Sequence, residues 1–346
     1  MENKELLLKV RHVKTYFPIK KGIFKRTVGH VKAVDDVSLD VYRGETLGLV
    51  GESGCGKTTL GKSILQLVPV TDGSMEYAFE DGAKDLRKLS RRDLDNARQK
   101  IQIVFQDPYS SLNPVLTIFS SLEDPLIKFG VKSKQERIER IGKLLEDVNL
   151  PREYMSRYPN EFSGGQRQRI GIARALSVKP ELIICDEAVS ALDVSIQAQV
   201  LKLLNKLKGE RGLTYIFITH DLSVVEYLAD RIAVMYLGRI VELTSSEELF
   251  ANPLHPYTKA LLSAIPVADV HRKKKRTPLQ GDVPSPANPP PGCSFHPRCP
   301  ACMERCRTDR PEVKEYTIND VSHFVACHRA EEFMAANADK SKEKTL

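Results

Sequence analysis

Short apolar runs alternate with amphipathic stretches along much of the chain. Residues 45–50, 181–187 and 214–220 are apolar runs of strand length. Residues 134–148 and 195–208 place apolar side chains three and four positions apart, which is typical of a helix with one buried face. Strands that alternate with helices indicate a parallel sheet with helices on both faces. The pattern therefore predicts an α/β fold with a mostly parallel sheet at its core.

Other regions depart from this alternation. Residues 6–13 predict a first strand, and residues 34–41 alternate apolar and polar side chains like a second strand. Residues 18–31 are basic and contain glycine, which indicates a hairpin or a loop excursion. The polar residues 71–95 predict strands and turns on a surface. After several prolines the pattern becomes helical, so we expect a mostly helical subdomain at about 107–165 inserted into the α/β core.

The stretch Gly51–Thr58 reads G-x-x-x-x-G-K-T and lies between an apolar run and a helix-forming run. This is the P-loop pattern, in which glycines let backbone N–H groups turn toward phosphates at a helix N-terminus. Lys57 would reach the β- and γ-phosphates, and the Thr58 hydroxyl would hold Mg²⁺. An ordinary glycine-rich turn is the alternative, but it requires neither the lysine nor the threonine. The residues predicted to bind ATP and Mg²⁺ here are Gly51, Ser53, Gly54, Cys55, Gly56, Lys57, Thr58 and Thr59.

Polar side chains end three other apolar strands. Asp186 and Glu187 end one of them, where the first would help to hold Mg²⁺ and the second would act as general base toward the attacking water. His220 ends another strand and could bond the γ-phosphate. Gln106 ends the strand 100–106 and could reach the metal or the water. Taken alone, His220 and Gln106 would be ordinary surface residues.

A second candidate anion-binding helix start is Ser163-Gly164-Gly165-Gln166, with Ser163 as the expected N-cap. One nucleotide has a single γ-phosphate, so one chain does not need two sites that bind it. We therefore expect this helix end to contact ATP that is held by a second subunit.

Composition adds few constraints. The chain has 346 residues, of which 41% are hydrophobic, and a net charge of +7. The tight basic run at 271–276 is interpreted as a solvated linker, with a membrane surface contact as the alternative. No apolar run approaches the length of a membrane span, and the charged N-terminus does not look like a signal peptide, so we expect a cytoplasmic protein.

Taken together, these motifs resemble the ATP-binding cassette superfamily. The resemblance covers the Walker A motif at Gly51–Thr58, the Q-loop Gln106, the signature at Ser163–Gln166, the Walker B strand ending at Asp186, and the switch His220. It implies a cassette with an antiparallel β subdomain and an inserted helical subdomain. It also implies a head-to-tail dimer closing on two ATP, a D-loop residue Asp193, and an adenine-stacking aromatic, for which Phe17 fits best and Tyr16 is the alternative.

Finer motifs are similar to those of the oligopeptide/dipeptide importer ATPases, F-type subunit. They are Phe105–Pro108, Ser190–Gln199 and His255–Leu262. The resemblance implies an ATPase motor on the cytoplasmic membrane face, two permease subunits, a D-type partner ATPase and an extracytoplasmic peptide-binding protein. The family usually has proline after the catalytic glutamate, whereas this chain has Ala188, which leaves the backbone there less rigid.

Five of the seven cysteines follow a proline-rich, basic linker at 266–292. Thiols this dense in a cytosolic chain suggest a soft metal. The importer resemblance implies a [4Fe-4S] cluster on Cys293, Cys299, Cys306 and Cys327, with Cys302 outside that pattern. Zinc and no metal are the alternatives. The expected domains are a nucleotide-binding domain at 1–265, the linker, a cysteine-rich module at 293–329 and a tail at 330–346.

A rival class is a soluble ATP-driven switch that acts on ribosomes or DNA. Translation-type members usually carry two cassettes, and repair-type members carry a long coiled coil that the interval between Lys57 and Ser163 cannot hold. We therefore expect no nucleic-acid partner. Dipeptides, longer peptides and nickel chelates all remain open as the transported substrate.

Overall fold

The computed structural model describes residues 5–107, 109, 111–265, 279 and 281–343, so the basic run at 271–276 lies outside the described residues. The chain divides into two compact units. The first holds the chain up to Leu8, Val41–Thr46 and Glu76–Thr219, and the second holds Lys9–Asp40, Leu47–Met75 and His220–Leu346. Within the described residues, no helix is both long enough and apolar enough to span a membrane.

A parallel sheet forms the centre of the first unit. Its strands are β6 (Ile101–Val104), β7 (Leu182–Asp186) and β8 (Thr214–Thr219), in the order β8-β7-β6. Every residue of β7 and β8 is buried, as expected for parallel strands covered on both faces. The register places Val104 beside Cys185, and Asp186 beside Ile218. The predicted parallel core is therefore present in this unit.

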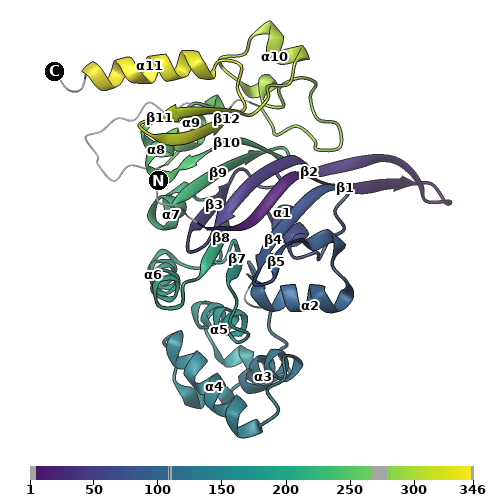
Figure 1. Cartoon of the computed structure of the whole chain (residues 1–346), viewed down its shortest axis with the longest axis vertical. Coiled ribbons are helices and arrows are strands. Elements are labelled where there is room, and N and C mark those ends of the chain that lie inside the picture. Colours follow the sequence, from purple (N-terminus) through teal and green to yellow (C-terminus); the bar gives the residue numbers. More distant parts are fainter. Residues whose placement is uncertain (1–4, 108, 110, 266–278, 280, 344–346) are drawn as a thin grey trace. The chain divides into compact units, whose positions relative to one another are not determined.

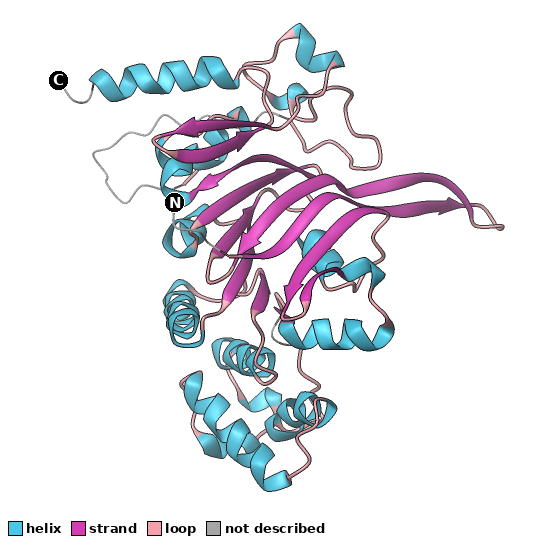
Figure 2. Ribbon diagram, viewed as in Figure 1, coloured by secondary structure: helices cyan, strands magenta, loops and turns pink. Residues whose placement is uncertain are grey.

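Helices make up most of the rest of the first unit (Figure 2). Helices α3 (Ile118–Lys128), α4 (Lys134–Asp147) and α5 (Gly164–Leu176) pack against one another, and the first two lie within the stretch 107–165 for which a helical subdomain is predicted. Helix α6 (Val194–Arg211) packs on α5. The remaining elements are α2 (Arg91–Lys100), β5 (Gly82–Asp85) with the end of β4 (Asp72–Phe79), and the 3₁₀ turns Leu86–Lys88, Arg152–Ser156 and Pro159–Glu161.

A mixed sheet forms the centre of the second unit. Strand β3 (Thr46–Val50) pairs in parallel with β9 (Arg231–Tyr236), which pairs antiparallel with β10 (Arg239–Ser245). Strand β10 then pairs antiparallel with β12 (Val321–Val325), and β12 with β11 (Lys314–Ile318). The C-terminal residues thus extend the sheet that carries the P-loop strand. The sequence pattern did not predict β9 to β12.

Strands β1 (Leu6–Lys21) and β2 (Arg26–Tyr42) are neighbours and form a long hairpin (Figure 1). The predicted strands at 6–13 and 34–41 lie within them, and the basic excursion between them is the far half of the hairpin. The helices of the second unit are α1 (Lys57–Ile64), α7 (Leu222–Leu228), α8 (Ser246–Ala251), α9 (Pro256–Ser263), the 3₁₀ turn His296–Arg298, α10 (Glu304–Thr308) and α11 (Ala330–Glu343).

Candidate nucleotide-binding site

The P-loop follows β3 and leads into α1, the context that the motif requires. Gly51, Gly54 and Gly56 all have positive φ, between 78° and 154°. A Cβ atom at Gly51 would lie 2.2 Å from the Met235 carbonyl oxygen, and one at Gly56 would lie 2.0 Å from the Ala33 carbonyl oxygen. Both positions therefore need glycine for space as well as for conformation.

Lys57 is folded back over its own loop and is only 4% exposed. Its Nζ donates to the Gly51 carbonyl at 2.7 Å and to the Glu52 carbonyl at 3.0 Å, and it lies 3.7 Å from the Cys55 sulfur. The ammonium group is thus held over the loop, where it can exchange carbonyl partners for phosphate oxygens. Burial raises the pKa of the Cys55 thiol.

Two residues from later in the second unit hold the P-loop, and sequence reasoning missed both. The Glu52 backbone N–H donates to the Tyr257 hydroxyl at 2.9 Å. The Glu52 carboxylate accepts two hydrogen bonds from Arg298, at 2.6 and 3.0 Å. The Arg298 side chain is only 5% exposed, and the carboxylate pairing raises its pKa. No sequence motif marks either residue as a partner of the P-loop.

Phe17 and Tyr16 were the alternatives for adenine stacking. The Tyr16 hydroxyl donates a short hydrogen bond to Asp35, and Lys32 lies over its ring with 5.8 Å between Nζ and the ring centroid. Burial and this carboxylate raise the pKa of Tyr16. Phe17 is 36% exposed at the neighbouring position. The structure thus gives Tyr16 a structural role and leaves the Phe17 ring accessible.

The two predicted carboxylates end β7 in the first unit. Asp186 is 4% exposed and is the last residue of the strand, whereas Glu187 has a left-handed backbone with φ of 49°. The Glu187 N–H donates to the Ile218 carbonyl at 2.9 Å, which fixes this strained turn. The Gln106 amide donates to the Glu187 carboxylate at 2.8 Å. The structure therefore brings together Gln106 and Glu187, which are far apart in the sequence.

Ser163 caps helix α5 as predicted. The Gln166 N–H donates to the Ser163 hydroxyl at 3.3 Å, and the Ser163 N–H donates to the Gln166 side-chain oxygen at 3.0 Å. This reciprocal capping box leaves the N–H groups of Gly164 and Gly165 at the helix start. A Cβ atom at Gly165 would lie 2.3 Å from the Ile196 Cγ2 atom, so this glycine is required by the close approach of α6.

Asp193 caps the neighbouring helix α6. Its carboxylate accepts from the Ile196 N–H at 2.9 Å and from the Ser195 hydroxyl at 2.7 Å. These hydrogen bonds, the backbone one foremost, lower the pKa of Asp193. Ala188, at the position where the family usually has proline, is buried.

In the second unit, His220 is exposed and directly follows the last residue of β8.

Backbone hydrogen bonds join some of the cysteines, from the Cys293 N–H to the Cys306 carbonyl at 2.9 Å and from the Cys302 N–H to the Cys299 carbonyl at 3.3 Å. Burial, reinforced by the thiols of Cys293, Cys299 and Cys306, raises the pKa of Cys327 to about 12. Burial also raises the pKa of Cys293 to about 11. Cys302, which lies outside the predicted set, donates to the Met303 carbonyl at 3.4 Å and also interacts with Cys299 and Cys306. Even so, the described residues contain no group of three or more His, Cys, Asp or Glu side chains arranged to hold a metal ion.

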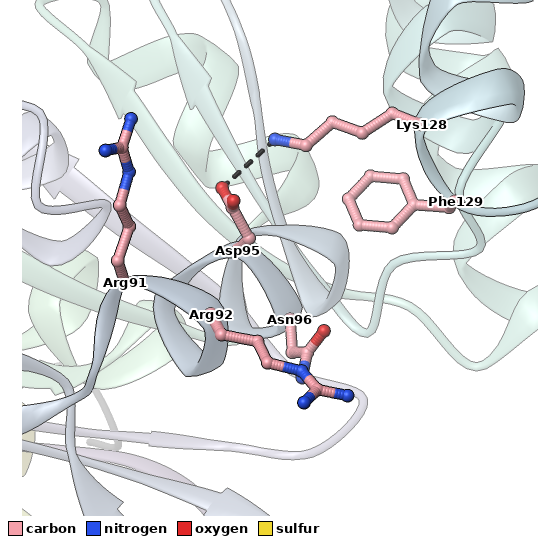
Figure 3. Close-up of a pocket in the computed structure, with 6 residues that line it drawn as sticks. All are labelled: Arg91, Arg92, Asp95, Asn96, Lys128 and Phe129. Atoms are coloured by element: carbon pink, nitrogen blue, oxygen red, sulfur yellow. Dashed lines mark hydrogen bonds and ion pairs between the residues drawn. The ribbon is translucent and has the colours of Figure 1, made fainter.

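A separate surface pocket lies between α2 and the end of α3 (Figure 3). Arg91, Arg92 and Asn96 line it from one helix, and Phe129 lines it from the other side. Lys128 reaches across it and donates to Asp95 at 3.0 Å. None of the predicted nucleotide-site residues lines this pocket, so it is separate from the candidate ATP site.

Comparison with known proteins agrees with this geometry. A family model described as "ABC transporter" matches residues 34–190, which include the P-loop, the signature and the two carboxylates. A solved structure of the dimeric cassette MJ0796 bound to ADP and Pi has a TM-score of 0.60 and 30% identity, covering 69% of this chain and 99% of its own. The structure of cbiO1 from Clostridium perfringens, part of the ABC transporter complex cbiONQ, also has a TM-score of 0.60, at 25% identity and 72% coverage of this chain and 92% of its own. The chain belongs to the ATP-binding cassette transporter family and is an ATPase of that class.

The C-terminal part defines the branch. A second model, described as "Oligopeptide/dipeptide transporter, C-terminal region", matches residues 241–306. The oligopeptide transport ATP-binding protein AppF of Bacillus subtilis is 53% identical over 329 residues, which cover 94% of this chain and 98% of that protein. A probable peptide ABC transporter ATP-binding protein of Sinorhizobium fredii is 50% identical over 342 residues, covering 99% and 95%. The chain is thus one of the oligopeptide/dipeptide-type ATP-binding subunits.

Proposed function

We propose that this chain is the ATP-hydrolysing motor subunit of an importer of dipeptides or oligopeptides. The observation that carries the proposal is the contact between Gln106 and Glu187 in a chain that also holds a complete P-loop. The amide keeps the carboxylate at the end of β7, in place to orient a water molecule. The match to the oligopeptide/dipeptide C-terminal region supports the substrate class.

In this proposal the γ-phosphate is lost by in-line attack of water. Glu187 accepts the proton as the water oxygen bonds to the γ-phosphorus, and the bond to the β,γ-bridging oxygen breaks to leave ADP and phosphate. Lys57 and the P-loop N–H groups neutralise the charge on the phosphates. Thr58 and Asp186 would hold Mg²⁺, which supplies further charge neutralisation, and His220 would bond the γ-phosphate. Phe17 would stack on adenine.

The remaining predicted residues serve a second subunit. Ser163, Gly164, Gly165 and Gln166 would contact ATP held by a partner ATPase, and Asp193 would contribute to the dimer contact. We infer a D-type ATPase as that partner. The N–H groups at the start of α5 and the close packing of α5 on α6 support this role. The nucleotide-binding domain in this proposal comprises residues 1–265.

Two permease subunits would complete the transporter at the cytoplasmic face of the membrane, with an extracytoplasmic peptide-binding protein. The pocket lined by Arg91, Arg92 and Phe129 supports one contact with a permease, because an acidic, partly apolar helix would complement it (Figure 3). Whether the cargo is a dipeptide, a longer peptide or a nickel chelate is decided by the other subunits in this assembly.

The cysteine-rich module at 293–329 would hold a [4Fe-4S] cluster on Cys293, Cys299, Cys306 and Cys327. The Cys293 N–H donates to the Cys306 carbonyl at 2.9 Å, so two of these cysteines are neighbours, and four thiolates are what such a cluster needs. Metal analysis of anaerobically purified protein tests it. About four irons per chain, lost in Cys306→Ser, would support the cluster, whereas stoichiometric zinc without iron would replace it with a zinc site.

The motor function is tested with permeases and partner reconstituted in vesicles. Peptide uptake should require ATP, and Glu187→Gln should lower ATP turnover by roughly a hundredfold or more, on the scale of general-base loss, while ATP binding persists. A cassette that hydrolyses ATP with no uptake of any peptide, and that co-purifies with no permease, would contradict the proposal.

A further inference from the structure

The side chains in the far half of the β1–β2 hairpin are mostly exposed. Phe17, Pro18, Lys20 and Lys21 on β1 are exposed, as are residues 26–28 on β2. Figure 1 shows the two strands continuing beyond the other strands of the second unit to a narrow tip. A hairpin that only completed the sheet would end where the packing ends, so this extension requires another explanation.

The tip, residues 20–26, combines two exposed apolar side chains with four cations. Ile23 is 97% exposed and Phe24 is 86% exposed, and they are adjacent. Lys20, Lys21, Lys25 and Arg26 surround them. Exposed single apolar residues are common, but a neighbouring aliphatic and aromatic pair at the end of a protrusion marks an interaction site.

The charge of the tip is uncompensated. No acidic residue lies between Glu5 and Asp35 in the sequence. Within the part of the chain that the structure describes, no ion pair involves Lys20, Lys21, Lys25 or Arg26. The tip is held in shape by its own turn, in which Gly22 and Lys25 have positive φ and the Lys25 N–H donates to the Gly22 carbonyl at 3.0 Å.

We propose that this hairpin tip binds the surface of an anionic lipid bilayer. Ile23 and Phe24 enter the boundary between headgroups and acyl chains, and the four cations lie among anionic headgroups. Apolar side chains flanked by Lys and Arg are the composition that lies in a membrane interface. Each cation near an anionic surface contributes about 1 kcal/mol, or roughly fivefold in partitioning. The inference deepens the proposed function, because it adds a second membrane contact to a subunit held by permeases.

A tryptophan at the tip gives a direct readout, because the natural chain contains none. The Phe24→Trp variant is mixed with phosphatidylglycerol-containing vesicles and, separately, with phosphatidylcholine vesicles. We expect its emission to shift to shorter wavelength with the anionic vesicles and to return in high salt. The control is Val313→Trp, at a position that is 55% exposed elsewhere in the same unit. An emission shift in the control variant alone, or equal shifts of Phe24→Trp with both lipids, would overturn the proposal.

Vesicle flotation then measures the contribution of each part of the tip. Ile23→Ser with Phe24→Ser, and Lys20→Glu with Lys25→Glu, should each weaken binding to anionic vesicles by about tenfold or more. Val313→Ser with Lys314→Glu makes matched changes at exposed positions and should leave binding intact. Equal losses in all three, or none in the tip variants, would show that another surface binds.

ATP turnover separates this inference from the motor function. The tip variants change none of the residues predicted to form the nucleotide site, so they should hydrolyse ATP at the normal rate. Glu187→Gln should bind vesicles normally while it loses turnover. Vesicle binding that fails in a protein with normal turnover overturns the tip proposal alone, and failed turnover with normal vesicle binding overturns the motor proposal alone.

Discussion

At the scale of single residues, the pairing of Arg298 with Glu52 determines how firmly the P-loop is held. The Arg298 guanidinium is buried and donates two hydrogen bonds to the Glu52 carboxylate. The backbone carbonyl of Glu52 also accepts a hydrogen bond from Lys57. Such fork-like pairs fix geometry more strongly than single ion pairs. Arg298 touches no predicted phosphate-binding group, so it acts as a positioning residue for the loop.

Replacing Arg298 tests this role. Arg298→Ala leaves the Glu52 carboxylate without its main partner, so the loop should become less ordered. We expect the KM for ATP to rise by roughly three- to tenfold, as for loss of a hydrogen bond to a charged group, with a smaller change in kcat. Arg298→Lys should recover part of the loss. Arg305→Ala removes an exposed cation of the same module and should change neither constant. A fall in kcat at constant KM would contradict a positioning role.

Gly165 allows a second test at this scale, because α5 contains a matched glycine. Gly165→Ala would place its Cβ against Ile196, and overpacking of this kind costs about 1–3 kcal/mol. A Cβ atom at Gly171 would have no atom within 4 Å, so Gly171→Ala should instead stabilise the helix by up to about 1 kcal/mol. Urea denaturation measures both changes. Adding Ile196→Ala should restore part of the stability of Gly165→Ala, and no recovery would show that the strain lies elsewhere.

At the scale of elements, the start of α9 contains a buried histidine that cannot easily take a proton. The His255 Nδ1 atom accepts from the Tyr257 N–H at 3.1 Å, which caps the helix. Burial, opposed by Glu242 and assisted by Lys259, lowers the pKa of His255 to about 4. The unfolded chain has the ordinary histidine pKa of about 6.5 and therefore binds a proton first as the pH falls.

This difference predicts acid destabilisation. Above about pH 7.5 His255 is neutral in both states and has no effect on stability. Between about pH 6.5 and 4 only the unfolded state gains the proton, so linkage predicts a loss of about 2 kcal/mol at pH 5 relative to pH 7.5. His255→Asn keeps a capping acceptor but does not titrate, so this part of the pH dependence should disappear. Urea denaturation at pH 5 and pH 7.5 measures the change in stability. Equal losses of stability in the natural protein and in His255→Asn would show that other groups cause the pH dependence.

Strong local signals explain which elements could be predicted from the sequence. The runs at 45–50, 181–187 and 214–220 became β3, β7 and β8, because a fully buried parallel strand must be apolar throughout. Helix α2 was missed, since its ten residues are mostly charged and only Ala97 is buried. Strands β11 and β12 were missed because they are short and half exposed, and their pairing with β10 is a long-range contact.

The residues of the candidate site also divide into those that could be predicted from the sequence and those that could not. Glycines, Lys57 and the carboxylates were found because their spacing alone marks their chemistry. Arg298 and Tyr257 were not found, because each reaches the P-loop from more than 200 positions away in the sequence. Only the folded chain shows that the cysteine-rich end and the P-loop are neighbours within one unit.

At the scale of the whole molecule, the C-terminal residues are part of the P-loop unit rather than an appendage. Strand β12 pairs with β10, and the buried His323 and Glu242 side chains join them at 2.7 Å. Phe295 is 1% exposed and packs on Tyr236, Tyr257 and His255. A large share of the core around β9 and β10 therefore comes from residues after 290.

A truncated chain tests whether the P-loop unit needs the C-terminal residues for stability and for ATP binding. A chain ending after residue 265 loses β12, Phe295 and Arg298 together, and loss of the Phe295 ring alone should cost about 3–5 kcal/mol. We expect a lower melting temperature and, in any protein that stays folded, weaker ATP binding because Glu52 has lost its partner. A chain ending after residue 338 keeps all of these contacts and is the control. If the chain of 265 residues melts and binds ATP like the control, the module is an independent domain. If it does not, the cysteine-rich end is positioned to transmit its own state directly to the nucleotide loop, since the two share a core and a buried ion pair.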